Sequence, residues 1–133
     1  MNFKFLLFCM FCFAFSSMAY ASESIHLSAI RYEESVEAND YIPIYIRVKN
    51  TDYNDMENLR VIIDSPEIEI FSISQKLDLS RFDVASFNVP VMIPYYINRG
   101  EYTFRVLILD DGNVRRSYYR SIYVSFYKNT RQY

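Results

Sequence analysis

The sequence predicts an all-β fold of about seven antiparallel strands in a two-layer sandwich. Three observations support this prediction. Segment 100–124 shows two strand patterns joined by an Asp-Gly turn, shorter runs upstream alternate apolar and polar residues, and no segment after residue 21 carries a helical apolar stripe longer than a turn or two. One domain is sufficient, because no repeat, linker or low-complexity tract divides the chain.

The carboxyl-terminal hairpin is the clearest feature of the sequence. Asp111-Gly112 lies between two β-rich runs and favours a type I′ turn, because both central residues of that turn need a positive φ. The arm before the turn has period two, which is typical of a strand with one buried face. Its two faces are Tyr102, Phe104, Val106 and Ile108 on the inside, and Thr103, Arg105, Leu107 and Leu109 on the outside.

Five further strands are predicted upstream of the hairpin. The first is weakly periodic and edge-like, whereas the second places four branched apolar residues on one face and polar residues on the other. The five ranges are 25–32, 41–49, 59–64, 67–73 and 82–93, and the connections between them are polar. The residues expected in the core are Ile44, Ile46, Val61, Ile63, Val89, Phe104 and Val106.

The first 21 residues have the pattern of a secretory signal peptide. One positive charge at Lys4 precedes an unbroken apolar run at 5–15, and Ala19-Tyr20-Ala21 is a small-x-small cleavage site. We expect cleavage after Ala21, which leaves residues 22–133 as a single secreted domain in the periplasm, at the cell surface or outside the cell. An uncleaved membrane anchor is the alternative, although the run is shorter than the roughly 20 residues of a spanning helix.

Charge and cysteine content indicate which partners and which stabilising interactions the domain can have. Without residues 1–21 the chain keeps 13 basic and 16 acidic residues, since Lys4 is the one charged residue of the leader. A near-neutral domain predicts no nucleic-acid partner, which usually requires a clustered basic excess. Both cysteines, Cys9 and Cys12, lie in the leader. The remaining domain therefore has no disulfide and depends on its apolar core.

Three stretches carry a resemblance to a known family. The first is a strand that ends in a polar turn, Ile44-Tyr45-Ile46-Arg47-Val48-Lys49-Asn50, and the second is the strand from Leu59 to Ile63 that follows it. The third is Gly100-Glu101-Tyr102-Thr103-Phe104-Arg105-Val106, a Gly-x-Tyr followed by an alternating strand that ends at an acidic turn. Together they resemble the immunoglobulin-like sandwiches of prokaryotic surface proteins, of the CARDB (cell-adhesion-related) and S-layer-associated type. The resemblance covers about residues 25–124 and implies a non-enzymatic adhesion or envelope module.

The sequence offers no catalytic motif and no catalytic residue. The lone histidine of the chain, His26, has no nucleophile or carboxylate pattern around it, and phosphate-binding and nucleophile-elbow motifs are absent. One histidine without a cysteine in the mature chain does not make a zinc site. We therefore expect neither an enzyme nor a resident cofactor.

Acidic turns are the candidate metal ligands. Asp52, Asp55, Asp110 and Asp111, named here the turn aspartates, lie in two turns that meet at one end of an immunoglobulin-like sandwich. Calcium prefers such oxygen-rich ends, so a bound Ca²⁺ is one hypothesis. The alternative is that aspartate is common in turns because its side chain hydrogen-bonds nearby backbone.

The last strand carries the candidate contact surface. Tyr119, Tyr123 and Tyr127 share one face with Arg115, and a surface of tyrosine, serine and arginine is typical of recognition sites. The alternative is that strands are rich in tyrosine for packing reasons alone. The opposite face of this strand carries Arg116, Tyr118 and Arg120.

These observations leave three hypotheses for function. The first is a small secreted or cell-envelope binding module that contacts an envelope protein or itself, in adhesion or surface assembly. The second is a calcium-dependent or carbohydrate-binding sandwich that uses the turn aspartates and nearby tyrosines. The third is an accessory subunit that joins an assembly by strand addition.

Overall fold

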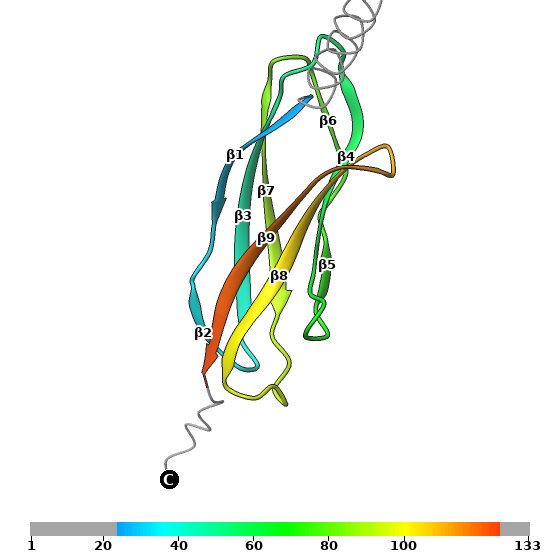
Figure 1. The fold of residues 1–133 in the computed structure, drawn as a ribbon. Coiled ribbons are helices and arrows are strands. Elements are labelled where there is room, and N and C mark those ends of the chain that lie inside the picture. Colours follow the sequence, from blue (N-terminus) through cyan, green and yellow to red (C-terminus); the bar gives the residue numbers. More distant parts are fainter. Residues whose placement is uncertain (1–23, 126–133) are drawn as a thin grey trace, which may run out of the picture.

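The computed structural model describes residues 24–125, which form an elongated sandwich of two β-sheets (Figure 1). The predicted all-β fold is therefore confirmed, and the described residues contain nine strands without a helix. The strands are β1 (Ile25–Arg31), β2 (Ser35–Glu37), β3 (Tyr41–Asn50), β4 (Met56–Asp64), β5 (Phe71–Ile73), β6 (Leu77–Leu79), β7 (Val84–Met92), β8 (Gly100–Asp110) and β9 (Asn113–Ser125).

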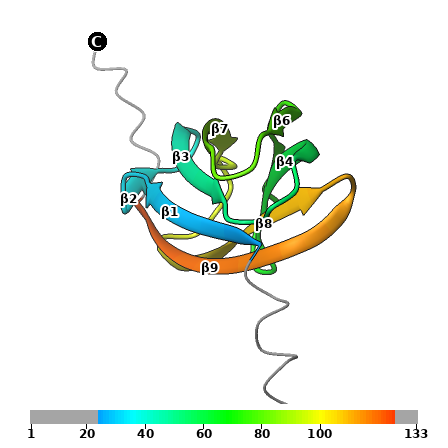
Figure 2. The ribbon, with the colours of Figure 1, turned by 90° about the horizontal axis from the view of Figure 1, so that it is seen from above.

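The two sheets differ in size. The smaller one has the order β1-β3-β7, and the larger one has the order β2-β9-β8-β4-β5, with β6 also paired to β4. All neighbours are antiparallel except β2 and β9, which run parallel. Figure 2 looks along the sandwich and shows the two layers facing each other. Because β1 and β2 belong to different sheets, the chain changes sheet between them.

Strict alternation builds the core between the sheets. Strand β3 buries every second residue from Ile42 to Asn50, as the period of two requires. All seven residues predicted for the core are at most 1% exposed. Phe104 is the largest fully buried side chain of the described residues. Its ring and that of Tyr32 form an edge-to-face pair, with the ring centroids 5.0 Å apart and an interplanar angle of 85°.

The turn of the final hairpin has the predicted backbone. Asp111 and Gly112 have φ angles of 49° and 83°, and Asp110 pairs with Asn113 across a two-residue loop. Positive φ at both central residues matches the type I′ turn and fits the right-handed twist of the arms. The pairing shifts by one residue after Ile108, so Arg115 is the extra residue of a β-bulge.

Three details differ from the sequence prediction. Strands β2 and β6 lie in segments predicted as connections, and the strand predicted at 67–73 is ordered as a strand only over β5. Ile70 is buried all the same, because it packs against the core from a turn in which its N–H donates to Ile68 O at 2.8 Å.

The predicted signal peptide, with Cys9 and Cys12, lies outside the described residues, as does Tyr127. Within residues 24–125 no helix has the length and apolar character needed to cross a membrane.

Candidate interaction face

The outer face of the final hairpin carries the predicted contact surface. Beyond the bulge, the odd-numbered residues of β9 point away from the core, and Tyr119 and Tyr123 are 56% and 37% exposed. Across the pair with β8, Tyr119 lies opposite Arg105 and Tyr123 lies opposite Glu101. The structure thus brings two of the predicted tyrosines to one solvent-facing surface, which we name the tyrosine face.

Polar contacts hold this face in place. Arg105 donates to Asp64 through two bonds, from Nε to Oδ1 at 2.9 Å and from Nη2 to Oδ2 at 2.6 Å. The hydrogen bond to Asp64 is the main reason that the pKa of Arg105 is raised, and Tyr119 adds to the rise. Arg99 Nε donates to Tyr123 Oη at 2.6 Å. The tyrosine hydroxyls are therefore oriented by arginines, while the rings stay accessible.

Arg115 lies apart from the tyrosines in the bulge beside the turn. Its Nη2 is 3.2 Å from Asp110 Oδ2. A partly exposed pair of this kind contributes little to stability, on the order of 0 to 1 kcal/mol. Because of this ion pair, the Arg115 side chain lies toward the turn and not beside Tyr119.

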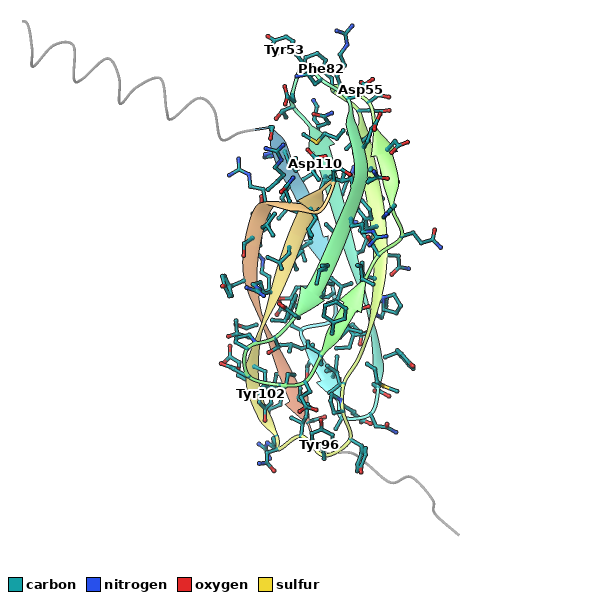
Figure 3. The ribbon with its side chains drawn as sticks, turned by 90° about the vertical axis from the view of Figure 1, so that its right-hand side faces the viewer. Tyr53, Asp55, Phe82, Tyr96, Tyr102 and Asp110 are labelled. Carbon is teal, nitrogen blue, oxygen red and sulfur yellow. The ribbon has the colours of Figure 1, made fainter. Side chains whose placement is uncertain are left out.

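The turn aspartates occupy two separate turns. Figure 3 shows Asp55 at the tip of the sandwich beside Phe82, whereas Asp110 lies lower on the molecule. Among the described residues no group of three or more His, Cys, Asp or Glu side chains is placed to hold a metal ion. Each carboxylate has a donor within the fold: Tyr53 N for Asp52, Arg81 N for Asp55, Arg115 for Asp110 and Asn58 Nδ2 for Asp111. Calcium binding stays a prediction.

Two exposed aromatic pairs cap the ends of the molecule and were not predicted. Tyr53 and Phe82 meet edge to face at 5.6 Å at one end, and Tyr95 and Tyr96 do so at 5.5 Å near the other (Figure 3). No periodic pattern marks them, because they lie in loops. The adjacent tyrosines at 95–96, directly after Pro94, were the one signal in the sequence.

Asn50 is the buried polar residue that sequence reasoning missed. Its Nδ2 donates to Asn54 O at 2.9 Å and to Leu79 O at 3.1 Å, and its Oδ1 accepts from Asp52 N at 2.9 Å. These bonds tie the turn after β3 to β6. The signal was available, because Asn50 continues the inward alternation of Ile42 to Val48.

The inner face of β9 is less enclosed than that of the other central strands. Arg116 and Tyr118 are half-buried and Arg120 is exposed, although all three lie on the side of β9 that faces the opposite sheet. His26 of β1 is also exposed and lies at the same side of the sandwich. These residues line a groove rather than a packed core.

Comparison with known proteins shows the fold. Neither a protein-family model nor a curated protein sequence matches this chain. Among solved structures, the CARDB domain of a Pyrococcus furiosus protein is similar in solution, with a TM-score of 0.55, 14% identity and coverage of 76% of this chain and 94% of that one. A crystal structure of that domain, in complex with di-metal ions, has a TM-score of 0.50.

Two larger proteins contain a similar domain. Native alpha-2-macroglobulin from Escherichia coli gives a TM-score of 0.57 at 13% identity over 77% of this chain and 16% of that chain. The alkylpurine DNA glycosylase AlkC of Pseudomonas fluorescens, bound to DNA with an abasic-site analogue, gives 0.53 at 9% identity over 76% of this chain and 30% of that chain. This chain thus spans less than a third of either. The likenesses confirm a CARDB-like, immunoglobulin-like β-sandwich.

Proposed function

We propose that this chain is a secreted, non-enzymatic binding module of the cell envelope, and that it contacts a protein partner through its tyrosine face. The observation that carries the proposal is the exposure of Tyr119 and Tyr123 on one sheet, with their hydroxyls next to Arg105 and Arg99. Large rings of low side-chain entropy are the groups that form hot spots in interfaces.

A role in adhesion or surface assembly rests on the resemblance to prokaryotic surface domains. The fold supports it, because the exposed tyrosines on one sheet face are open to contact with another protein. A non-enzymatic role is supported by the sequence, in which His26 stands without a nucleophile or an acid–base partner.

The test compares two double substitutions of the same chemistry. Tyr119→Ser with Tyr123→Ser removes the tyrosine face, whereas Tyr41→Ser with Tyr45→Ser removes two tyrosines from the outer side of β3, which are 68% and 37% exposed. Purified variants are used as bait on an envelope extract, and bound proteins are quantified by mass spectrometry. We expect the first variant to lose a partner that the second retains.

The same experiment contains its refutation. If both variants retain the partner, or if both lose it equally, the tyrosine face has no special role. If the first variant unfolds at a clearly lower urea concentration than the second, the rings stabilise the fold instead. Secretion is tested separately, because the intact mass of the exported product should begin at Ser22.

A calcium-dependent module is the second candidate. The observation in its favour is that the similar Pyrococcus domain crystallised in complex with di-metal ions. In this chain the turn aspartates would supply the oxygen ligands, and a few loop residues would have to move to bring them together. Thermal unfolding with and without Ca²⁺ tests this candidate independently of any protein partner.

A further inference from the structure

A groove separates β1 from residues 116–120 of β9. Figures 1 and 2 place the two strands alongside each other on the same side of the sandwich, although they belong to different sheets. The groove is open to solvent and has a volume of about 890 Å³. Its wall on the β1 side is formed by Ile25, His26 and Leu27, and its wall on the β9 side by Arg116, Tyr118 and Arg120.

The edge of β9 is open along this groove. Strand β2 covers only the end of that edge, where Tyr123 N donates to Glu34 O at 2.8 Å. Because main-chain groups alternate between the two sides of a strand, the residues two, four and six positions earlier face the same edge. They are Ser121, Tyr119 and Ser117, and no strand of the described residues pairs with them there.

Side chains donate hydrogen bonds to two carbonyl groups of this edge. Tyr32 Oη donates to Ser121 O at 2.9 Å, and Arg120 Nη1 donates to Tyr119 O at 2.8 Å. The amide N–H groups of the same edge face the groove without a strand beside them. A strand edge with unpaired main-chain groups can accept an added strand. The side chains of Tyr32 and Arg120 would have to leave the carbonyl groups to which they donate.

The positive charge of the groove favours a partner that carries carboxylates. Its described lining contains two arginines, Arg116 and Arg120, and no carboxylate. Arg116 Nε donates only to a neutral acceptor, Ile25 O, at 3.3 Å. Arginine binds carboxylates more strongly than neutral carbonyls, often through two parallel hydrogen bonds. An incoming carboxylate is therefore the better acceptor for both guanidinium groups.

We propose that the groove binds an extended, acidic segment of a partner protein, which adds to the open edge of β9 and places carboxylates on Arg116 and Arg120. In such a strand every second side chain lies on the inner face, next to the inward residues of β9. A segment that alternates acidic and apolar residues meets both arginines from that face. This site uses the main chain of Tyr119 and the inner face of β9, whereas the tyrosine face consists of the exposed rings on the outer face.

The experiment measures binding of a short fluorescein-labelled peptide, with alternating Glu and Val, to the purified protein by fluorescence anisotropy. Three comparisons use the unchanged protein: a peptide with Gln in place of Glu, a peptide with N-methylated amides on alternate residues, and polygalacturonate as an anionic sugar polymer. The protein variant Arg116→Gln with Arg120→Gln is compared with Arg47→Gln with Arg81→Gln, which removes two exposed arginines outside the groove.

We expect the Gln peptide and the Arg116→Gln, Arg120→Gln variant each to lower the affinity by about tenfold or more, because a charge-assisted contact is lost. The control variant should bind as the unchanged protein does. N-methylation should abolish binding, because it blocks strand addition.

Several results would overturn the proposal. Equal binding of the Glu and Gln peptides would exclude carboxylate recognition, and equal binding of the N-methylated peptide would exclude strand addition. Stronger binding of polygalacturonate than of the peptide would assign the groove to a sugar. A concentration-dependent dimer that disappears in the Arg116→Gln, Arg120→Gln variant would assign it to a second copy of this chain. The peptide comparisons decide the question even if that variant fails to fold.

Discussion

Replacement of Phe104 by alanine tests the register on which the description of the hairpin depends. Phe104 is 1% exposed and lies near the centre of β8, where its ring forms an edge-to-face pair with that of Tyr32. Removal of a fully buried phenyl ring costs about 3 to 5 kcal/mol, from lost burial and from the cavity that remains. The lost edge contact, on the order of 0.5 to 1.5 kcal/mol, favours the upper part of that range.

The assay is urea unfolding followed by circular dichroism, since the chain has no tryptophan for fluorescence. The expected loss is a large fraction of the 5 to 15 kcal/mol that a typical domain has, so it shifts the midpoint strongly. Leu107→Ala is the matched control, because Leu107 belongs to the same strand but lies half-exposed on the outer face. It should cost clearly less, about 1 kcal/mol.

The outcome that contradicts this reasoning is specific. A loss of a few tenths of a kcal/mol at Phe104, with a larger loss at Leu107, would show that β8 is shifted by one residue, which would turn every side chain of the strand to the other face. The variant Phe104→Leu tests whether an apolar side chain of another shape is enough at this position. It keeps an apolar side chain at the same position and should recover most of the stability lost in the alanine variant.

Three further predictions concern single features of the domain. Asn50→Ala should lower the free energy of unfolding by about 2 to 4 kcal/mol in urea, because it breaks three hydrogen bonds in a buried site, whereas Asn54→Ala, whose side chain is exposed, should change it little. A few millimolar Ca²⁺ should raise the thermal midpoint if the turn aspartates bind it, and an unchanged midpoint relative to EDTA would remove this ion from the hypotheses. Burial raises the pKa of Tyr32 above its usual 10.0, and Glu34 adds to the rise. The unfolded chain therefore loses this proton first, so the associated stability is present below pH 10.0 and is lost as the pH rises through the higher pKa of the folded state. Tyr32→Phe should flatten the fall in unfolding free energy above that pH, and an unchanged slope would contradict the assignment.

Local patterns explain why most of the sandwich was predictable. The alternation in β3 and β8 and the Asp111-Gly112 turn are determined by neighbouring residues, so the period and the turn chemistry locate them without knowledge of the partner strands. The face of each tyrosine in β9 follows from the same parity. Tyr119 and Tyr123 therefore lie on the outer face as this parity indicates, whereas their role in contact stays a prediction.

Long-range pairing explains what the sequence did not predict. Strand β2 has three residues, of which only Val36 is buried, and its partner residues at 123–125 are far away in the chain. Strand β6 likewise exists because Leu77 and Leu79 meet β4, not because of a periodic pattern of its own. Three-residue strands carry too little alternation to be recognised. The open edge of β9 depends on where β2 pairs, so it was also beyond prediction.

The change of sheet between β1 and β2 connects these observations to function. It leaves the upper edge of β9 open, and such an edge is a hazard because two copies of a protein can pair through it. In an antiparallel pair of two β9 strands centred on Tyr118, Arg116 of each copy would lie opposite Arg120 of the other. Like charges directly opposite each other destabilise a sheet. The arginines that would bind an acidic partner therefore also disfavour pairing of the chain with itself. Substitution of both by glutamine should increase self-association in sedimentation experiments, and unchanged sedimentation would contradict this reasoning.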